Sequence, residues 1–342
     1  MRKELNRRQF LTRSALASAG LTAVSQTQSS AIEPALSPSP VVPNSKGILQ
    51  AGKIGTRTVS RLITGGNLLS GWCHQRDLLF VRNLAEAYLS EQKQFDTLQM
   101  LEERGVNTIV LDMIQIDIVN KYKKQRGGKI QVIASVRENW GDWSNPKGWN
   151  ALKTEIRQAI DKGPDLIYLH GGYVDQLAKT GKPENMHLIA QAIEFIREQK
   201  FTAGIGAHEL AALKECDKSG IKCDFYVKTF HHDKYWSATP KANRKPYSVD
   251  GQGSLDHNEF HDNIFCLDPE ATAEYMLDKS QPWIAFKVLA AGAIAPRSGF
   301  KYAFENGADF IAVGMFDFEV NEDVQALKQS LDGLQRERPW RG

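Results

Sequence analysis

Short apolar runs of strand length recur along residues 58–335, separated by stretches with apolar residues at three- and four-residue spacing. The runs are rich in β-branched and aromatic residues, as is typical of parallel strands covered on both faces. They span residues 60–66, 107–112, 131–136, 165–170, 202–208, 223–228, 283–289 and 309–315. Eight strand–helix units of this size predict a single-domain α/β protein, a (β/α)8 TIM barrel. An open doubly wound sheet is the alternative, but no GxGxxG motif follows any run.

Three segments lie outside this alternation, and two insertions interrupt it. Residues 1–31 have the character of an export signal, residues 32–57 form a linker rich in Pro and Ser, and residues 336–342 form a tail. Insertions at 67–90 and 229–268 follow the first and sixth predicted strands. A barrel keeps its active site at the carboxyl ends of its strands, so we expect lids or binding loops here.

Polar residues end six of the eight predicted strands: Asp112, Ser135, His170, His208, Lys228 and Lys287. Because these ends surround one site in a parallel barrel, the pattern predicts that the six side chains share an active site. Side chains alternate between the inside and the outside of a barrel. Counting back in steps of two predicts that the interior also holds Val110, Ile133, Tyr168, Gly206, Tyr226 and Ala285.

Two of the six residues are lysines on adjacent strands. A lysine becomes a nucleophile when its pKa falls, and a desolvated site with a second cation lowers it. Segments 226–229 and 286–294 resemble the lysine-bearing strands of deoxyribose-phosphate-type aldolases. The resemblance implies that Lys228 forms a Schiff base, with Lys287 as the neighbour that lowers its pKa. Alternatively, each lysine pairs with a carboxylate such as Asp112 as part of the barrel's packing.

These residues predict lyase or isomerase chemistry on a small sugar-like or carbonyl metabolite, through proton transfer next to a carbonyl group. Asp112, His170 and His208 would move protons or hold hydroxyl groups, and no cofactor is required. The residues expected to bind the substrate are Ser135, His74, His231, His232 and Trp236. A non-catalytic barrel that binds a ligand in the periplasm is the alternative outside enzyme chemistry.

A divalent metal is a second way to use the histidines. His170, His208, His231 and Asp112 have the right ligand types for zinc or a similar ion. No HxH or HExxH pair is present, and two inward lysines would repel a divalent cation.

The first half of the predicted barrel resembles the aldo/keto reductases. The resemblance lies in residues 59–66 and in Asp165-Leu-Ile-Tyr-Leu-His170. It implies carbonyl reduction with a nicotinamide cofactor. The second predicted strand keeps Asp112 but lacks the tyrosine that follows in that family, and the third has Ser135 where a lysine is expected.

Charge argues against nucleic acid as a partner. The chain has a formal charge of +3, but residues 1–31 hold five basic residues and one acidic residue, so the remainder carries −1. Phosphate-backbone binding needs a basic face, which this neutral body does not supply. No apolar run reaches the length needed to span a membrane.

The segment Asn6-Arg7-Arg8-Gln9-Phe10-Leu11, followed by a short apolar stretch, resembles a twin-arginine export signal. The resemblance implies passage of a folded protein through the twin-arginine machinery to the periplasm. Cysteines can pair in that oxidising compartment. The spacing of Cys73, Cys216, Cys223 and Cys266 matches no zinc motif and no CxxC, so we expect buried free thiols.

Overall fold

The protein is described from a computed structural model that places residues 40–74, 78–138, 143, 145–247 and 265–342. The predicted signal at 1–31 lies outside the described residues, as does the predicted linker before residue 40. No helix in the described part of the chain has both the length and the apolar character needed to cross a membrane.

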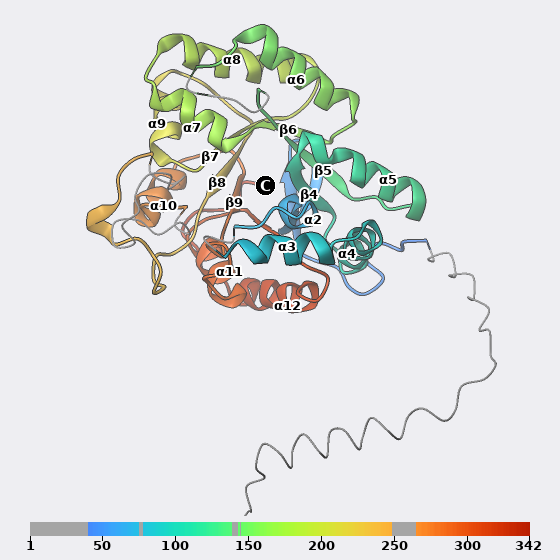
Figure 1. Cartoon of the computed structure of the whole chain (residues 1–342). Coiled ribbons are helices and arrows are strands. Elements are labelled where there is room, and N and C mark those ends of the chain that lie inside the picture. Colours follow the sequence, from blue (N-terminus) through green and yellow to red (C-terminus); the bar gives the residue numbers. More distant parts are fainter. Residues whose placement is uncertain (1–39, 75–77, 139–142, 144, 248–264) are drawn as a thin grey trace, which may run out of the picture. The chain divides into compact units, whose positions relative to one another are not determined.

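The eight predicted strands form one closed parallel barrel, so the predicted fold class is confirmed (Figure 1). The hydrogen-bonded order is β10-β3-β4-β5-β6-β7-β8-β9. The strands are β3 Leu62–Gly65, β4 Thr108–Asp112, β5 Gln131–Val136, β6 Leu166–Leu169, β7 Ala203–Ala207, β8 Phe225–Thr229, β9 Trp283–Phe286 and β10 Phe310–Val313.

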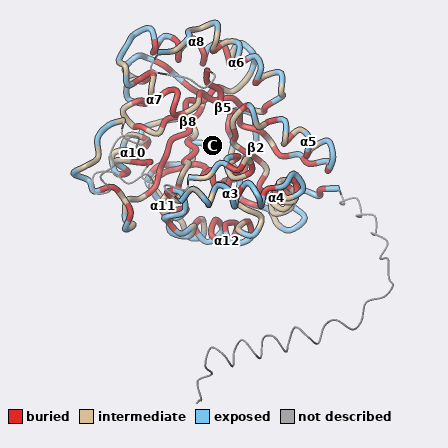
Figure 2. Tube along the Cα trace, in the orientation of Figure 1, coloured by how far each residue is buried: buried red, intermediate tan, exposed pale blue. Residues whose placement is uncertain are grey.

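Helices cover the outside of the barrel, and buried positions concentrate in the strands and on the inner helix faces (Figure 2). These helices are α4 Glu91–Glu103, α5 Ile116–Arg126, α6 Trp149–Asp161, α7 Gly171–Lys179, α8 Pro183–Glu198, α9 Leu210–Lys218, α10 Pro269–Leu277, α11 Pro296–Glu305 and α12 Val320–Leu331. The expected insertion at 67–90 contains α2 Gly66–Leu69 and α3 Leu79–Tyr88, and short 3-10 turns η1 Met113–Gln115 and η2 Lys241–Asn243 follow β4 and β8. Of the insertion expected at 229–268, residues 248–264 lie outside the described part.

Apolar side chains from alternate strand positions fill the barrel interior. Val110, Ile133 and Tyr168 lie there, as the sequence pattern predicts. Gly206 leaves room for the Tyr168 ring, because a Cβ at this position would lie 2.9 Å from Cε2 of Tyr168. The interior positions predicted for β4 to β7 are therefore confirmed.

The predicted interior face of β8 is wrong. Phe225 and Val227 pack inside the barrel, whereas Tyr226 packs against the outer layer of helices. Lys228 lies two residues after Tyr226, so its side chain leaves β8 on the same outer face. In β9, Phe286 contacts the interior cluster, and Ala285 belongs to the outer one. Both faces of a doubly covered strand are apolar, so alternation alone does not identify the inner face.

A hairpin begins within the predicted linker at 32–57 and continues into the predicted start of the barrel. Strands β1 Ala51–Ile54 and β2 Arg57–Ser60 pair antiparallel. The turn between them contains Gly55 at φ +59°, a conformation that favours glycine. Ile54 and Val59 are fully buried and join the interior cluster, so the hairpin closes the amino-terminal end of the barrel.

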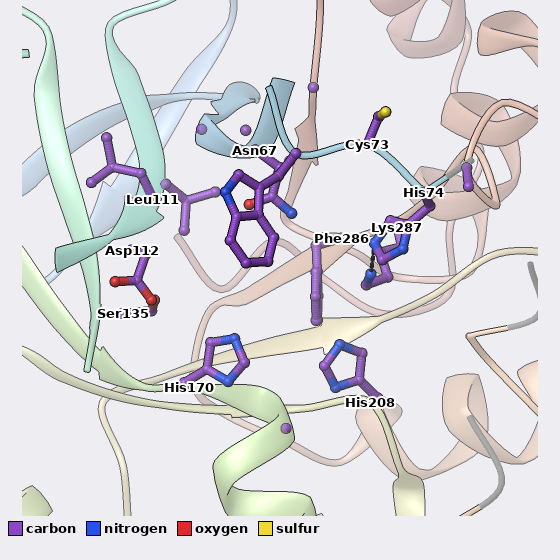
Figure 3. A pocket seen from close by; sticks show the side chains of 18 of the residues that line it. Asn67, Cys73, His74, Leu111, Asp112, Ser135, His170, His208, Phe286 and Lys287 are labelled. Carbon is purple, nitrogen blue, oxygen red and sulfur yellow. Dashed lines mark hydrogen bonds between the residues drawn. The ribbon is translucent and has the colours of Figure 1, made fainter. Parts of the chain in front are cut away.

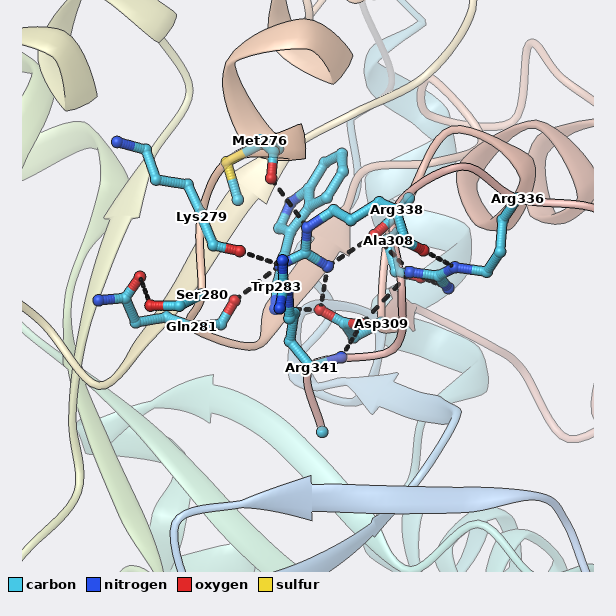
Figure 4. A network of polar contacts seen from close by, with 12 residues as sticks. Met276, Lys279, Ser280, Gln281, Trp283, Ala308, Asp309, Arg336, Arg338 and Arg341 are labelled. Carbon is cyan, nitrogen blue, oxygen red and sulfur yellow. Dashed lines mark hydrogen bonds and ion pairs between the residues drawn. The ribbon is translucent and has the colours of Figure 1, made fainter.

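The expected tail at 336–342 also belongs to the folded body (Figure 4). Arg338 is buried and donates hydrogen bonds from Nε to the Met276 carbonyl (2.8 Å) and from Nη2 to the Gln281 carbonyl (2.8 Å). Its Nη1 lies 2.5 Å from Oδ2 of the fully buried Asp309. Asp309 in turn accepts the backbone N–H of Trp283 at the start of β9. This segment therefore ties the end of the chain to the base of the barrel.

Candidate active site

One large cavity opens at the carboxyl ends of the strands, with a volume of about 1230 Å³. We call it the main cavity. Figure 3 shows its central side chains, which come from β4, β5 and β9 and from the segments after β3, β6, β7 and β9. Five of the six predicted strand-end residues line it, namely Asp112, Ser135, His170, His208 and Lys287, and His74 lines it as well.

The part of the cavity near β4 and β5 contains a buried ion pair that the sequence pattern did not predict. Nη1 of Arg137 contacts Oδ2 of Asp112, and both side chains are largely buried. Asp112 Oδ1 also accepts the backbone N–H of Ile114, which caps η1. Arg137 lies two residues beyond Ser135, the register partner of Asp112, and just past the end of β5, where sequence inspection could have found it as a cation.

Tyr168 provides a phenol beside this ion pair. Burial raises the pKa of Tyr168 above its ordinary value, and the Ser135 hydroxyl partly offsets that increase. The phenol therefore keeps its proton at neutral pH and can donate a hydrogen bond to an oxygen in the cavity.

His170 follows β6 and points into the main cavity (Figure 3). Its ring centroid lies 5.7 Å from that of Trp143 and 6.5 Å from that of His208. Burial, the charge of Arg137 and the neighbouring His208 lower the pKa of His170 well below its ordinary value. His170 is therefore neutral at neutral pH, with a lone pair on one ring nitrogen and a proton on the other.

His208 follows β7 and is held by a carboxylate from α7. Its Nδ1 lies 2.9 Å from Oδ2 of Asp175, and its backbone N–H donates to the same oxygen at 2.9 Å. The backbone N–H of Glu209 donates to the other oxygen of Asp175. With Nδ1 on Asp175, the opposite edge of the imidazole, which carries Nε2, is directed to the cavity (Figure 3).

Asp175 is the second functional residue that sequence reasoning missed. Burial raises its pKa to about 7, against the opposing effects of the two backbone N–H groups and the charge of Lys228. Asp175 lies in a helix, 33 residues before His208, and no local motif connects the two. Only the fold brings them together.

Lys287 reaches the mouth of the main cavity through an unusual backbone conformation. Its φ is +56°, in the left-handed region, and Ala290 and Ala291 in the following turn also have positive φ. Strand alternation continued from Phe286 would direct Lys287 outward, and the left-handed residue turns it to the cavity instead. Such a conformation costs a non-glycine residue about 1–2 kcal/mol and often marks a functional site.

The Lys287 ammonium contacts His74, from the segment after α2. Nζ lies 2.5 Å from Nε2 of His74 and 4.1 Å from the centroid of the Phe265 ring. Loss of water around the imidazole, the charge of Lys287 and the neighbouring His208 lower the pKa of His74. His74 therefore accepts a hydrogen bond from the lysine as a neutral group.

Lys228 does not line the main cavity. Its side chain is 1% exposed, and Nζ donates to the carbonyl of His208 (2.7 Å) and to the carbonyl and hydroxyl of Thr229 (2.9 Å each). Three acceptors use the three protons of the ammonium group. The prediction that Lys228 points into the barrel with the other strand-end residues is therefore wrong.

The remaining predicted residues lie outside the main cavity. The fully buried His231 has Nδ1 against the His232 carbonyl, while Nε2 accepts the N–H groups of Phe265 and Cys266. His232 Nε2 contacts Ser298, and its Nδ1 accepts the N–H of Lys234. Trp236 is 86% exposed. These positions place none of the three against a ligand in the main cavity.

The predicted metal ligands are not brought together. His231 lies apart from Asp112, His170 and His208, and both of its ring nitrogens are engaged within the protein. Within the described residues, no group of three or more His, Cys, Asp or Glu side chains has the arrangement of a metal site.

No disulfide joins the four cysteines, as expected, but only three of them are buried. Cys216, Cys223 and Cys266 are buried, and Cys73 is partly exposed at the main cavity. Burial raises the pKa of Cys216 and Cys223, so these thiols stay protonated and unreactive at neutral pH.

No family model matches the chain, and no curated protein matches it. Two solved structures of a Pseudomonas aeruginosa protein assigned to the aldo-keto reductases share the fold at 14% identity and a TM-score of 0.52, covering 82–84% of this chain and 95–97% of theirs. A protein from Coccidioides immitis assigned as a deoxyribose-phosphate aldolase is 10% identical, with a TM-score of 0.37 and coverage of 93% and 98%. At this identity the likeness to the Pseudomonas aeruginosa structures shows the TIM-barrel fold alone.

Proposed function

We propose that the protein is an enzyme that transfers a proton next to the carbonyl group of a small oxygenated metabolite, as isomerases and lyases do. One observation carries the proposal: His208, anchored by Nδ1 on the buried Asp175, lines the same cavity as the lysine Lys287. An oriented imidazole base and a cation able to stabilise an enolate oxygen are the two components that such a reaction needs.

In this proposal His208 removes the proton from the carbon next to the carbonyl through Nε2. Asp175 keeps the Nδ1 proton in place and stabilises the imidazolium that forms. The ammonium group of Lys287 donates a hydrogen bond to the carbonyl oxygen, and that bond strengthens as negative charge develops. Neutral His170 and the Tyr168 phenol hold substrate hydroxyl groups or return the proton to a neighbouring atom.

A Schiff base, if one forms, is assigned to Lys287 instead of Lys228. Deprotonated Nζ would add to the carbonyl carbon and release water, giving an imine that borohydride reduces to a stable secondary amine. Treatment with borohydride and a candidate carbonyl compound, followed by peptide mass spectrometry, distinguishes a Schiff base on Lys287 from a Lys287 ammonium that only donates a hydrogen bond. An adduct on Lys287 supports covalent chemistry, whereas activity without an adduct supports the ammonium as a hydrogen-bond donor.

The proton-transfer proposal is tested by hydrogen exchange in D2O. Hydroxyaldehydes, hydroxyketones and free sugars are incubated with the protein, and NMR follows loss of the signal from the carbon next to the carbonyl. We expect His208→Asn to lower the exchange rate by about 10²- to 10⁴-fold. His187→Asn, on the exposed surface of α8, is the matched control and should keep the rate.

Unchanged exchange in His208→Asn would contradict the proposal. Saturable binding of these compounds without exchange would instead favour a ligand-binding barrel.

Reduction of a carbonyl compound with a nicotinamide cofactor is the second candidate. The Asp112–Arg137 ion pair favours it, because Arg137 supplies the cation that Ser135 cannot, and the Tyr168 phenol lies beside Ser135 as a proton donor. Fluorescence titration with NADPH tests this candidate. Saturable NADPH binding that is weakened by Arg137→Met would support carbonyl reduction. An absence of NADPH binding would contradict it.

We also propose export by the twin-arginine route, supported by the sequence around Arg7 and Arg8. Replacing both arginines with lysine should keep the full-length protein in the cytoplasm of a bacterial host. Recovery of that variant from the periplasm at the native level would contradict this assignment.

A further inference from the structure

We propose that Lys228 is a positioning residue for His208: its buried ammonium clamps the His208 backbone and keeps negative charge on Asp175, so that the imidazole carries its proton on Nδ1 and presents the Nε2 lone pair to the main cavity. This inference rests on the proposed role of His208 as a base and adds the group that selects its tautomer.

The clamp holds His208 at four points. Asp175 accepts the backbone N–H and the Nδ1 side of the ring, both at 2.9 Å. On the other side, the carbonyl of His208 accepts from Nζ of Lys228 at 2.7 Å and from the Thr229 hydroxyl at 2.9 Å. Strand β8 and helix α7 therefore fix the backbone and the ring of one residue from opposite sides.

Among the described residues, no carboxylate lies at hydrogen-bond distance from the Lys228 ammonium, whose three acceptors are neutral oxygens. A buried ammonium without a paired anion acts on the nearest negative charge through a medium that screens weakly. Lys228 lowers the pKa of Asp175 against the effect of burial. An ionised Asp175 accepts the Nδ1 proton, whereas a protonated one would donate to Nδ1 and reverse the tautomer.

Other charged and titratable groups surround this pair. Glu209 follows His208 at the start of α9, and His231 lies beyond β8 within the field of Lys228. Across the main cavity, His208 and Lys287 both lower the pKa values of His170 and His74. Lys228 both donates a hydrogen bond to the His208 carbonyl and lowers the pKa of Asp175.

The test is ¹⁵N NMR of histidine-labelled protein, with the His208 signals identified by their absence from His208→Gln. In the native protein we expect the Nδ1–H tautomer for His208 at neutral pH. In Lys228→Met we expect His208 to change to the Nε2–H tautomer, because an Asp175 that gains a proton donates it to Nδ1. Lys228→Arg should keep the native tautomer, and Lys218→Met, which removes an exposed lysine from α9, is the matched control.

Two outcomes would overturn the inference. One is an Nε2–H tautomer for His208 in the native protein, a measurement that needs no variant to fold. The other is a folded Lys228→Met protein in which His208 keeps the native tautomer. Neither experiment uses a substrate, so failure of the proposed reaction and failure of the Lys228 assignment can be distinguished.

Discussion

Arg338 and Asp309 form an ion pair at the base of the barrel in which the side chains are 1% and 0% exposed. Arg338 Nη1 also donates to the Gly307 carbonyl at 2.9 Å, and Nη2 reaches the Lys279 carbonyl at 3.1 Å. Asp309 additionally accepts the backbone N–H of Arg341 at 2.9 Å. Burial of these two charges is tolerated because nearly every polar atom around them has a partner.

Removing the arginine should therefore be costly. We expect Arg338→Met to lower the free energy of unfolding by about 3–5 kcal/mol, since it leaves Asp309 charged and buried without its main partner. Urea denaturation measures the change. Arg82→Met is the control: it breaks an exposed ion pair with Glu86 and should change stability by less than about 1 kcal/mol. Equal losses of stability in Arg338→Met and Arg82→Met would contradict this account of the buried ion pair.

The left-handed backbone at Lys287 predicts a separation of stability from activity. Lys287→Gly should raise the free energy of unfolding by about 1 kcal/mol by relieving the positive φ, while activity is lost. Lys287→Ala removes the same amine but keeps the strained conformation, so it should lose activity without the gain in stability. Thermal unfolding of the two variants makes the comparison. The prediction fails if the alanine variant is at least as stable as the glycine variant.

The close approach of β7 to Phe225 predicts a steric effect inside the barrel. A Cβ at Gly204 would lie 2.5 Å from Cζ of Phe225. Gly204→Ala should lower stability by about 1–3 kcal/mol, because the packed interior cannot make room without strain. Adding Phe225→Leu should recover part of that loss, so the double variant should be more stable than the sum of the single effects. If the stability changes of the two single variants, measured by denaturant unfolding, simply add up in the double variant, the two positions are not coupled.

Asp323 in the first turn of α12 predicts a pH dependence of stability. It is 3% exposed, and burial together with Glu319 and Glu322 raises its pKa to about 7. Folding therefore favours the protonated form, and the stability from this group is complete below about pH 4 and lost as the pH rises to 7.

Asp323→Asn should match the native protein at pH 4 and exceed its stability at pH 8 by on the order of 2 kcal/mol. Glu322→Gln, at an exposed neighbouring position, should show a smaller difference. A native-like pH profile in Asp323→Asn would argue against a raised pKa. Chemical denaturation at both pH values measures these differences.

The sequence pattern predicted the barrel well because each strand is a short apolar run with a helix after it. It also located the main cavity, since strand ends such as Asp112, His170 and His208 meet wherever a parallel barrel closes. The parity of β8 could not be predicted, because Phe225 and Tyr226 are equally suited to a buried face. The β1–β2 hairpin was missed because its strands have four residues each and lie beside a segment rich in Pro and Ser.

The partners of the site residues were harder to predict than the residues themselves. Asp175 is 33 positions from His208 in the sequence, and its role depends on the packing of α7 beside β7. Lys287 was correctly expected at the cavity, but for an incomplete reason: a left-handed residue, and not strand alternation, directs it there. Backbone conformations of this kind have no signal in a single sequence when the residue is not glycine.

The position of Arg338 in the sequence has a consequence for biogenesis. The ribosome makes every strand of the barrel before it makes the residue that completes the hydrogen-bonded base, whereas the proposed export signal is made first. A nascent chain that still lacks Arg338 leaves Asp309 without its shorter ion pair, so folding should finish only after the eight strands have left the ribosome. Quality control that admits only folded cargo to the export machinery would then act after translation has passed this arginine.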